Sequence, residues 1–530
     1  MNLHSFGHRQ GVAAAPHRDT AAAGRQIFAE GGNALEAMIA MAASIAAVYP
    51  HMNHLGGDGF WLVRERSGRV RAFMGAGPAG AGASIARYVE QGLAEIPVRG
   101  PLAALTVPGA VGTWILAQEY AAACGGRLPL KVLLQSAVEQ ARSYLVTRSQ
   151  AELCAENVAT LEAVPGFADT FLIDHKPPPA GTRLAQPRLA DTLEQLSRAG
   201  LDDFYRGDVG REMASDLAAI ASPIERADLE GYRAVLTEPL SLSLPSGEVF
   251  NTAPPTQGLA SLLLLGLFDR LGVAEAESFD HVHGLVEATK RAFMWRDRVI
   301  TDPRALTSPP ERYLEPAFLG AEVRRIDRRR AAAFPAPSAR GDTVWMGAAD
   351  ASGLVVSYIQ SIYWEFGSGC VLPRTGVLMQ NRGASFSLDR QARNPLAPGR
   401  QPFHTLNPAL AILKDGRILA YGTMGGDGQP QTQAQVFTRH VCYGQPLEEA
   451  LDRPRWVLGR TWGSPRTSLR VEPRLAANLI DQLMDAGHDV DVLAQPYSDT
   501  VGHAGAVVLH PDGLLEGAHD PRADGGAAGL

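Results

Sequence analysis

The sequence has few cysteines, no basic excess and no long apolar run. Its four cysteines among 530 residues form no CxxC pair and no metal-ligand spacing, which excludes zinc fingers and disulfide scaffolds. A formal net charge of −7 lacks the basic excess that a nucleic-acid partner requires. The most apolar stretch, residues 259–268, is too short to span a bilayer, and residues 1–17 contain no hydrophobic signal region. We therefore expect a soluble, cytoplasmic protein with neither a nucleic-acid nor a membrane partner.

Apolar residues make up 45% of the chain, enough to bury a large core. Two helices follow the 3.6-residue period, one capped by Asn33 and reaching Tyr49, the other over residues 283–298. Separate hairpins and helices predict antiparallel sheets covered by helices, not a doubly wound parallel sheet. The hairpins are predicted by pairs of β-prone runs around a glycine turn: 60–63 with 70–73, 344–349 with 354–359, 409–413 with 418–421, and 506–509 with 514–515.

One stretch differs from the rest in composition. Residues 324–340 are rich in Arg, Ala and Pro without apolar periodicity, which predicts an exposed linker, and a strand pattern starts directly after it at Val344. Thr343 therefore lies between a solvated linker and a buried strand. If the chain were cut before Thr343, its freed α-amine would be a base beside its own hydroxyl. Taken alone, a threonine that opens a strand is more often there for its β propensity.

Two other patterns are better explained structurally. Residues 75–80 match GxGxxG, but they follow a hairpin strand and contain a proline, which favours an ordinary glycine-rich loop. No Asp or Glu stands at a ligand spacing beside the pairs His51 with His54 and His281 with His283, which argues against a metal site at either pair. We expect no metal and no cofactor.

Short motifs follow one another along almost the whole chain, at residues 31–37, 50–51, 55–60, 106–109, 254–258, 287–290, 302–303, 343, 350, 353, 366–369, 381, 425–426 and 520–522. In this order they resemble the gamma-glutamyltranspeptidase family of N-terminal nucleophile hydrolases. The resemblance implies an α+β fold, a four-layer αββα sandwich built jointly by two chains after the precursor cleaves itself. The large subunit would be residues 1–342, ending in the linker at about 324–342, and the small subunit 343–530, together one composite domain. A dimer of such two-chain units stays open.

The resemblance also assigns the catalytic residues by position. Thr343 would be the nucleophile, and Ser361 would steady it. Gly425 and Gly426 would supply the two backbone N–H groups that hold the oxyanion, a task that suits residues without a Cβ. Without the other motifs, this glycine pair would be read as an ordinary turn.

Several positions depart from the family pattern. Met74 stands where the family has the arginine that reads glutamate, and Ser385 replaces the acidic partner of the substrate α-amine. Because each charge-assisted contact contributes roughly 1.5–3 kcal/mol, we expect poor binding of γ-glutamyl groups. The remaining departures are His404 and Thr405 in place of two serines, and Val344 and Trp345 beside the nucleophile.

One positive charge is gained near the substrate, at Arg382. Its guanidinium can hold a carboxylate through two parallel N–H bonds. The alternative is a surface arginine paired with Asp389 or Glu365. With Asn381, His404 and Thr405 nearby, Arg382 would line the acyl pocket.

This pattern looks like the cytosolic branch of the family, which includes oxamate amidohydrolase of bacterial purine breakdown and glutaryl- or cephalosporin-type acylases. We expect a self-processing amidohydrolase that cleaves a small carboxylate-bearing amide, with oxamate as the favoured substrate, to oxalate and ammonia. A γ-glutamyltransferase or glutathione hydrolase, a glutaryl-type acylase and an uncut binding protein stay as alternatives.

Overall fold

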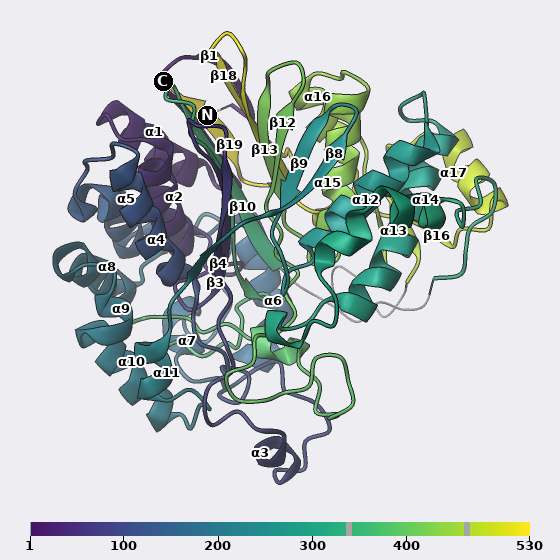
Figure 1. The fold of residues 1–530 in the computed structure, drawn as a ribbon. Coiled ribbons are helices and arrows are strands. Elements are labelled where there is room, and N and C mark those ends of the chain that lie inside the picture. Colours follow the sequence, from purple (N-terminus) through teal and green to yellow (C-terminus); the bar gives the residue numbers. More distant parts are fainter. Residues whose placement is uncertain (1, 335–341, 460–466) are drawn as a thin grey trace.

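A computed structural model describes residues 2–334, 342–459 and 467–530. Two seven-stranded sheets dominate it (Figure 1). The first contains, in spatial order, β19 (Gly526–Gly529), β2 (Gly11–Ala15), β10 (Asp342–Asp350), β11 (Val355–Tyr363), β3 (Asp58–Arg64), β4 (Val70–Gly75) and β7 (Val235–Thr237). The second contains β1 (His4–His8), β18 (Leu515–His519), β17 (Ala504–Leu509), β13 (Ile418–Thr423), β12 (Ala409–Leu413), β9 (Gly247–Asn251) and β8 (Leu240–Leu244).

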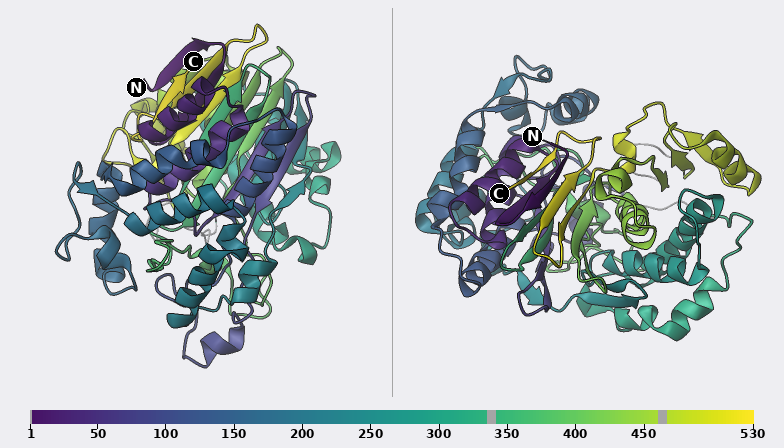
Figure 2. Two further views of the ribbon diagram at one scale, coloured as in Figure 1. Left: turned by 90° about the vertical axis from the view of Figure 1, so that its left-hand side faces the viewer. Right: turned by 90° about the horizontal axis from the view of Figure 1, so that it is seen from above.

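Helices cover the outer face of each sheet, so the molecule has four layers, which Figure 2 shows from above. Outside the first sheet lie α1 (Arg18–Ala29), α2 (Ala34–Val48), α4 (Ala110–Ala123), α5 (Leu130–Arg142), α6 (Arg148–Leu161) and α8 (Pro187–Ala199), with the shorter α7 (Phe167–Phe171), α9 (Asp203–Arg206), α10 (Asp208–Ala219) and α11 (Arg226–Gly231). Outside the second lie α12 (Gly258–Leu271), α13 (Phe279–Val299), α14 (Pro316–Val323), α15 (Gly428–Phe437), α16 (Leu447–Asp452) and α17 (Ala477–Asp485). The predicted αββα sandwich is confirmed.

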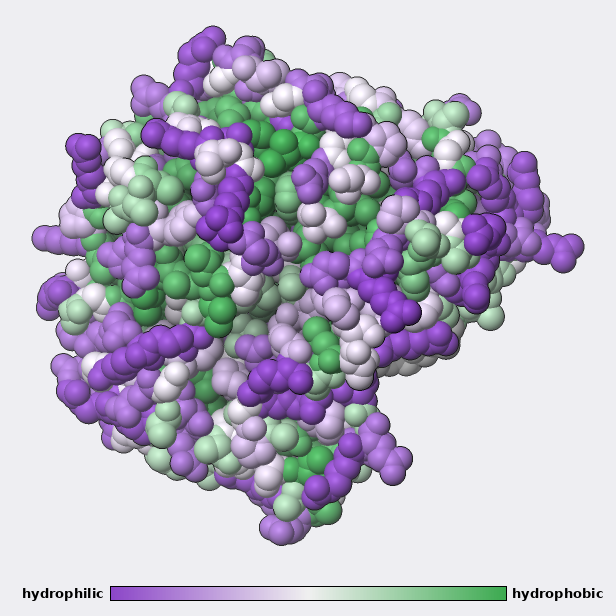
Figure 3. All heavy atoms as spheres, in the orientation of Figure 1, coloured by the Kyte–Doolittle hydropathy of each residue, from purple (hydrophilic) through white to green (hydrophobic). Residues whose placement is uncertain are grey.

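Smaller elements lie outside these layers. They are α3 (Ile85–Val89), a three-stranded sheet of β14 (Trp456–Leu458), β15 (Leu469–Val471) and β16 (Val490–Val492), and the pair β5 (Tyr144–Leu145) and β6 (Arg183–Leu184). In the space-filling view of Figure 3, apolar residues gather over the sheet layers and hydrophilic residues dominate the outer helical edge at the right. No helix among the described residues is long and apolar enough to cross a membrane.

The two sheets pack through one face of each strand. In β3, Phe60 and Leu62 face the second sheet, whereas Trp61 and Val63 face the helices, as the two-residue period of a strand requires. Trp345 of β10 lies in the layer between the sheets. A Cβ on Gly422 or Gly505 would come within 2.1 or 2.5 Å of its ring, so glycines at this paired position make room for the indole.

The four predicted hairpins are all confirmed, as β3–β4, β10–β11, β12–β13 and β17–β18. Asn33 caps α2, as predicted, and forms a capping box with Glu36. The periodic pattern predicted that α2 would bury one face, but every residue of α2 is buried. Helices α1, α4 and α5 and the first sheet all pack against it. Helix α13 begins four residues before the predicted start.

The described part of the predicted linker, residues 324–334, contains neither helix nor strand and is mostly exposed. Residues 335–341 of that prediction lie outside the described residues. β10 begins at Asp342, directly before Thr343.

Candidate active site

Thr343 lies at an irregularity at the start of the central strand β10. The pairing of β10 with β11 shifts between Asp342 and Val344, which places Thr343 in a bulge. Such bulges re-aim a side chain out of the regular alternation of a strand. Thr343 is fully buried, and its Oγ1 accepts a hydrogen bond from Nε2 of Gln429, 3.3 Å away.

The Gly425–Gly426 turn leads from β13 into α15, the helix that carries Gln429. Both glycines have positive φ, +111° and +52°, a region that favours glycine. Within the described part of the chain, neither of their N–H groups donates to a backbone carbonyl. Two free N–H groups at the start of a helix are a suitable place for a negatively charged oxygen.

The side chain of Gln257 forms hydrogen bonds with this turn and with the neighbouring loop. Its Nε2 donates to the carbonyl oxygens of Thr405 (2.6 Å) and Gly426 (2.8 Å), and its Oε1 accepts from Arg296 (3.1 Å). Arg296 also pairs with the buried carboxylate of Asp427, at 2.7 Å. Burial raises the pKa of the Asp427 carboxyl to about 6, although the Arg296 charge opposes that shift. The network ties the glycine turn to the loop that carries Thr405.

Arg382 is a buried arginine with unused hydrogen-bonding groups. It is 1% exposed, and its Nη1 donates a hydrogen bond to the Oγ1 of Thr405 at 3.4 Å. Its Nε and Nη2 have no hydrogen-bond partner among the described residues. Burial lowers the pKa of Arg382 to about 10, so the side chain stays charged at neutral pH. The alternative of a surface arginine paired with Asp389 or Glu365 is wrong, because the fold encloses the side chain and no ion pair to either is found among described residues.

His404 forms a buried pair with Asp58, at 2.7 Å between Nε2 and Oδ2. The Oδ1 of Asp58 accepts three further hydrogen bonds, from the backbone N–H groups of Gly77 and Gly109 and from Nε2 of Gln380. Asp58 therefore joins the loops around the site. Burial, reinforced by the charge of Arg382, lowers the pKa of His404 to about 4.

Ser361 and Met74 lie on strands of the first sheet that flank β3, Ser361 on β11 and Met74 on β4. Ser361 is on β11, opposite the bulge that contains Thr343, and its Oγ accepts the backbone N–H of Tyr363 at 2.8 Å. Met74 is on β4 beside Phe60, whose ring lies 4.8 Å from that of His404. Met74 is thus placed in the apolar layer next to the His404 loop.

Asn381 and Ser385 contact backbone in the described structure. The Asn381 side chain donates to the carbonyl of Val98 at 2.9 Å and accepts the N–H of Trp364 at 3.1 Å. The Ser385 hydroxyl donates to the carbonyl of Phe403 at 3.1 Å. Both residues tie down the loops on either side of Arg382.

A second polar cluster lies away from the site. His283, Glu287 and His488 place one ligand atom each within 4.8 Å of one another, so the prediction that no acidic residue stands at a ligand spacing beside His283 is wrong. Glu287 follows one helical turn after His283, on the same face. The ammonium of Lys290 lies 2.6 Å from Glu287, and His283 contacts the carbonyl of Asp327 at 2.9 Å. The cluster holds the segment that precedes residue 335.

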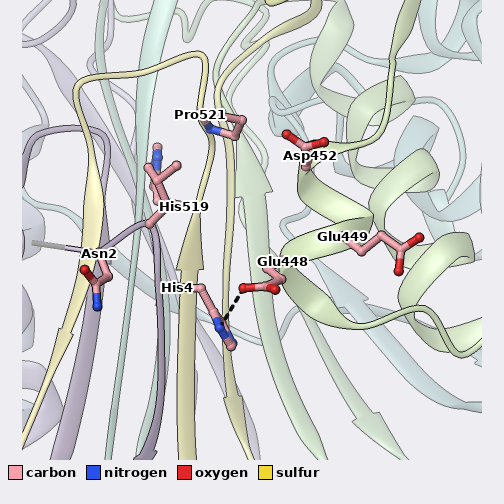
Figure 4. A pocket seen from close by; sticks show the side chains of 8 residues that line it. Asn2, His4, Glu448, Glu449, Asp452, His519 and Pro521 are labelled. Carbon is pink, nitrogen blue, oxygen red and sulfur yellow. Dashed lines mark ion pairs between the residues drawn. The ribbon is translucent and has the colours of Figure 1, made fainter. Parts of the chain in front are cut away.

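The cavity of about 740 Å³ at the edge of the second sheet is not this site. Figure 4 shows its acidic lining and the 3.0 Å ion pair between His4 and Glu448. None of the residues predicted for the active site lines it.

Sequence reasoning missed Asp58, Gln257, Arg296, Asp427 and Gln429. Asp58 and Gln257 lie inside the motifs at 55–60 and 254–258, and Asp427 follows the glycine pair directly. A polar residue inside a glycine- or proline-rich motif was the available signal. Gln429 had none, because it is one of four glutamines in a helix that is buried throughout.

Comparisons with known proteins agree with this geometry. Residues 20–530 match the gamma-glutamyltranspeptidase family. The chain belongs to that family. The oxamate amidohydrolase proenzyme of Klebsiella pneumoniae is 51% identical over 521 residues, with 98% of each chain covered. The glutathione hydrolase-like YwrD proenzyme of Bacillus subtilis is 38% identical over the full length of both chains.

A solved structure that is similar to the whole chain has the same fold. Cephalosporin acylase from Bacillus halodurans superposes with a TM-score of 0.90 at 29% identity, covering 99% of this chain and 97% of that one. The sandwich described above is therefore that of the N-terminal nucleophile hydrolases, as the resemblance implied.

Proposed function

We propose that the chain is a self-processing amidohydrolase with Thr343 as its N-terminal nucleophile. Cleavage between Asp342 and Thr343 would give subunits of residues 1–342 and 343–530 that stay together as one sandwich. The position of Thr343 in a buried bulge, with its hydroxyl held by Gln429, supports this assignment. Relatives named proenzymes are consistent with processing.

The substrate we propose is a small amide with a carboxylate beside the scissile bond, with oxamate as the first choice. The observation that carries this proposal is the buried, charged Arg382 with two unused donor nitrogens. An unpaired buried charge is costly, so a site that keeps one is built for an anionic ligand. The similarity to an oxamate amidohydrolase proenzyme supports the same choice.

The reaction follows from these groups. The hydroxyl of Thr343 attacks the amide carbon while its α-amine accepts the proton. The N–H groups of Gly425 and Gly426 stabilise the oxyanion, and Ser361 orients the amine. The amine then passes the proton to the leaving nitrogen, the C–N bond breaks, and ammonia departs. Water attacks the oxalyl ester and releases oxalate.

Two alternatives have specific support. The cephalosporin acylase fold favours a larger dicarboxylic amide such as a glutaryl amide. The glutathione hydrolase-like relative favours a γ-glutamyl substrate. Against the latter, Met74 is an apolar side chain in an apolar layer and offers no charge to an α-carboxylate.

The four cysteines support a cytoplasmic location. All are free, and Cys154 and Cys370 are buried as thiols. Free thiols are typical of a reducing compartment.

The test is an ammonia-release assay on three amides: oxamate, a glutaryl amide and lactamide, which is a neutral amide of similar size to oxamate. A γ-glutamyl anilide is assayed separately by the colour of the aniline that it releases. Wild type should prefer oxamate, whereas Thr343→Ala should stay uncut on a denaturing gel and release no ammonia. Arg382→Met should lose oxamate activity by more than about 100-fold, since it removes a charged contact, but not activity on the neutral amide. Faster turnover of the glutaryl or γ-glutamyl substrate by wild type would overturn the oxamate choice.

A further inference from the structure

Asp58 determines which nitrogen of His404 carries a proton. Carboxylate oxygens accept hydrogen bonds, so the Nε2 of His404, 2.7 Å from the Oδ2 of Asp58, is the donor. The Oδ1 atom already accepts three N–H groups, which holds the carboxylate in this orientation. A neutral imidazole has one N–H, and here it points at Asp58.

The other nitrogen, Nδ1, therefore carries no proton, and its lone pair can accept a hydrogen bond. It is buried and has no hydrogen-bond partner among the described residues. A buried acceptor without a donor is costly, so this atom is expected to serve a ligand. His404 is next in sequence to Thr405, whose hydroxyl contacts Arg382 at 3.4 Å.

Two neighbouring groups thus leave opposite hydrogen-bonding capacities unused. Arg382 offers N–H donors at Nε and Nη2, and His404 offers an acceptor at Nδ1. A ligand that satisfies both has an anionic acceptor on one side and an N–H donor on the other. A carboxylate joined to a primary amide has this arrangement.

We propose that His404 is a specificity-determining residue that accepts an N–H of the scissile amide, and that Asp58 is its positioning residue. This inference rests on the proposed function and deepens it, because it restricts the substrates to amides that keep an N–H on the leaving nitrogen. His404 takes up no proton in the reaction. It holds the amide group while the proton from the Thr343 amine goes to the leaving nitrogen.

The test compares oxamate with monomethyl oxalate, which has the same carboxylate and forms the same oxalyl enzyme but leaves through an oxygen without a proton. In Asp58→Asn, the new amide N–H would face Nε2 and drive the His404 proton to Nδ1, so the acceptor becomes a donor. We expect the ratio of kcat/KM for oxamate over the half ester to fall about 10- to 100-fold. The denaturing gel must still show two chains. An unchanged ratio, with both substrates slowed alike, would overturn the inference.

A second pair of variants does not depend on Asp58. In His404→Asn the side-chain oxygen can replace the Nδ1 acceptor, whereas His404→Leu has none. We expect the oxamate preference to persist in the first and to fall in the second, and equal ratios in the two would overturn the inference even if Asp58→Asn does not fold. Wild type that hydrolyses neither substrate would instead overturn the proposed function.

Discussion

The ring of Tyr363 lies directly beneath the guanidinium of Arg382, with 3.7 Å from the Arg382 Cζ to the ring centroid. Tyr363 reaches this position with a φ of +84°, a left-handed conformation that is uncommon for a residue with a side chain. Strained backbone of this kind is concentrated at functional sites. The Tyr363 ring stabilises one face of the guanidinium, and the Nε and Nη2 of Arg382 stay available to an anion.

Replacing Tyr363 should therefore weaken binding of the carboxylate. Tyr363→Leu removes a buried cation–π contact of up to about 2 kcal/mol, so we expect KM for oxamate to rise roughly 10- to 30-fold, with kcat much less affected. Steady-state kinetics would measure both constants.

Tyr363→Phe is the matched control. It keeps the aromatic ring under Arg382, and it keeps a residue with a side chain at the positive φ of this position. KM should stay within about threefold of wild type. If the two variants weaken oxamate binding equally, the stack does not support Arg382.

The backbone conformation of Gly425 leads us to expect a large effect of its substitution on kcat. A Cβ there would lie 3.6 Å from the nearest atom, in Gly502, so Gly425→Ala introduces no clash but opposes the φ of +111°. The shifted turn should misplace an oxyanion donor and lower kcat by about 10²–10³-fold. Gly513→Ala, at φ +81° in open space on the β17–β18 turn, tests the same strain and should leave kcat unchanged. Equal losses in both would contradict the role of the Gly425 N–H.

Gln257 should affect catalysis through the same turn. Gln257→Ala leaves buried carbonyls of Thr405 and Gly426 without their donor, so kcat should fall at least tenfold and stability by about 1–3 kcal/mol. Gln435→Ala is the control, since this buried glutamine of α15 donates instead to the carbonyl of Trp456. Thermal unfolding should show similar losses in both variants, and only Gln257→Ala should slow oxamate hydrolysis. A kcat that falls in neither would show that the Gly426 turn holds without Gln257.

The hairpins and the capped helix could be predicted because each is a local pattern. A glycine turn between two β-prone runs specifies β10–β11, and Asn33 with Glu36 specifies the start of α2. Strands β2 and β19 could not be predicted in this way, because GVAAA and GAAG have low β propensity. They form strands because β2 pairs with β10 and with β19 in the folded sheet, a long-range pairing that no local pattern specifies.

The site was predictable where a family motif marks it and not where distant loops meet. Thr343 and Gly425 were predicted from their positions in the motifs, and Arg382 was predicted as a departure from the family pattern directly after Asn381. The Asp58–His404 pair joins residues 346 positions apart, and nothing local in either segment specifies the contact. Burial of Arg382 was equally hidden, because a lone arginine in a polar stretch looks like a surface residue until the fold encloses it.

Stability should rise with pH between about 4 and 6.5. Burial is the main cause that lowers the pKa of His54, His281, His488 and His519 to about 3 and that of His404 to about 4. In this window the unfolded chain binds protons at these histidines and the folded chain does not, so acid favours unfolding. Asp427 acts in the opposite sense, since a folded pKa of about 6 makes the folded state bind the extra proton. The histidines with lowered pKa values outnumber this one carboxyl, so unfolding takes up protons near pH 5. The midpoint of thermal unfolding should therefore rise steeply from pH 4.5 to 6.5 and level off at higher pH.

His519→Leu, which removes one of these buried imidazoles, should reduce the slope by about one proton. A midpoint that is flat or falls over this range would show that the imidazoles gain protons in the folded enzyme.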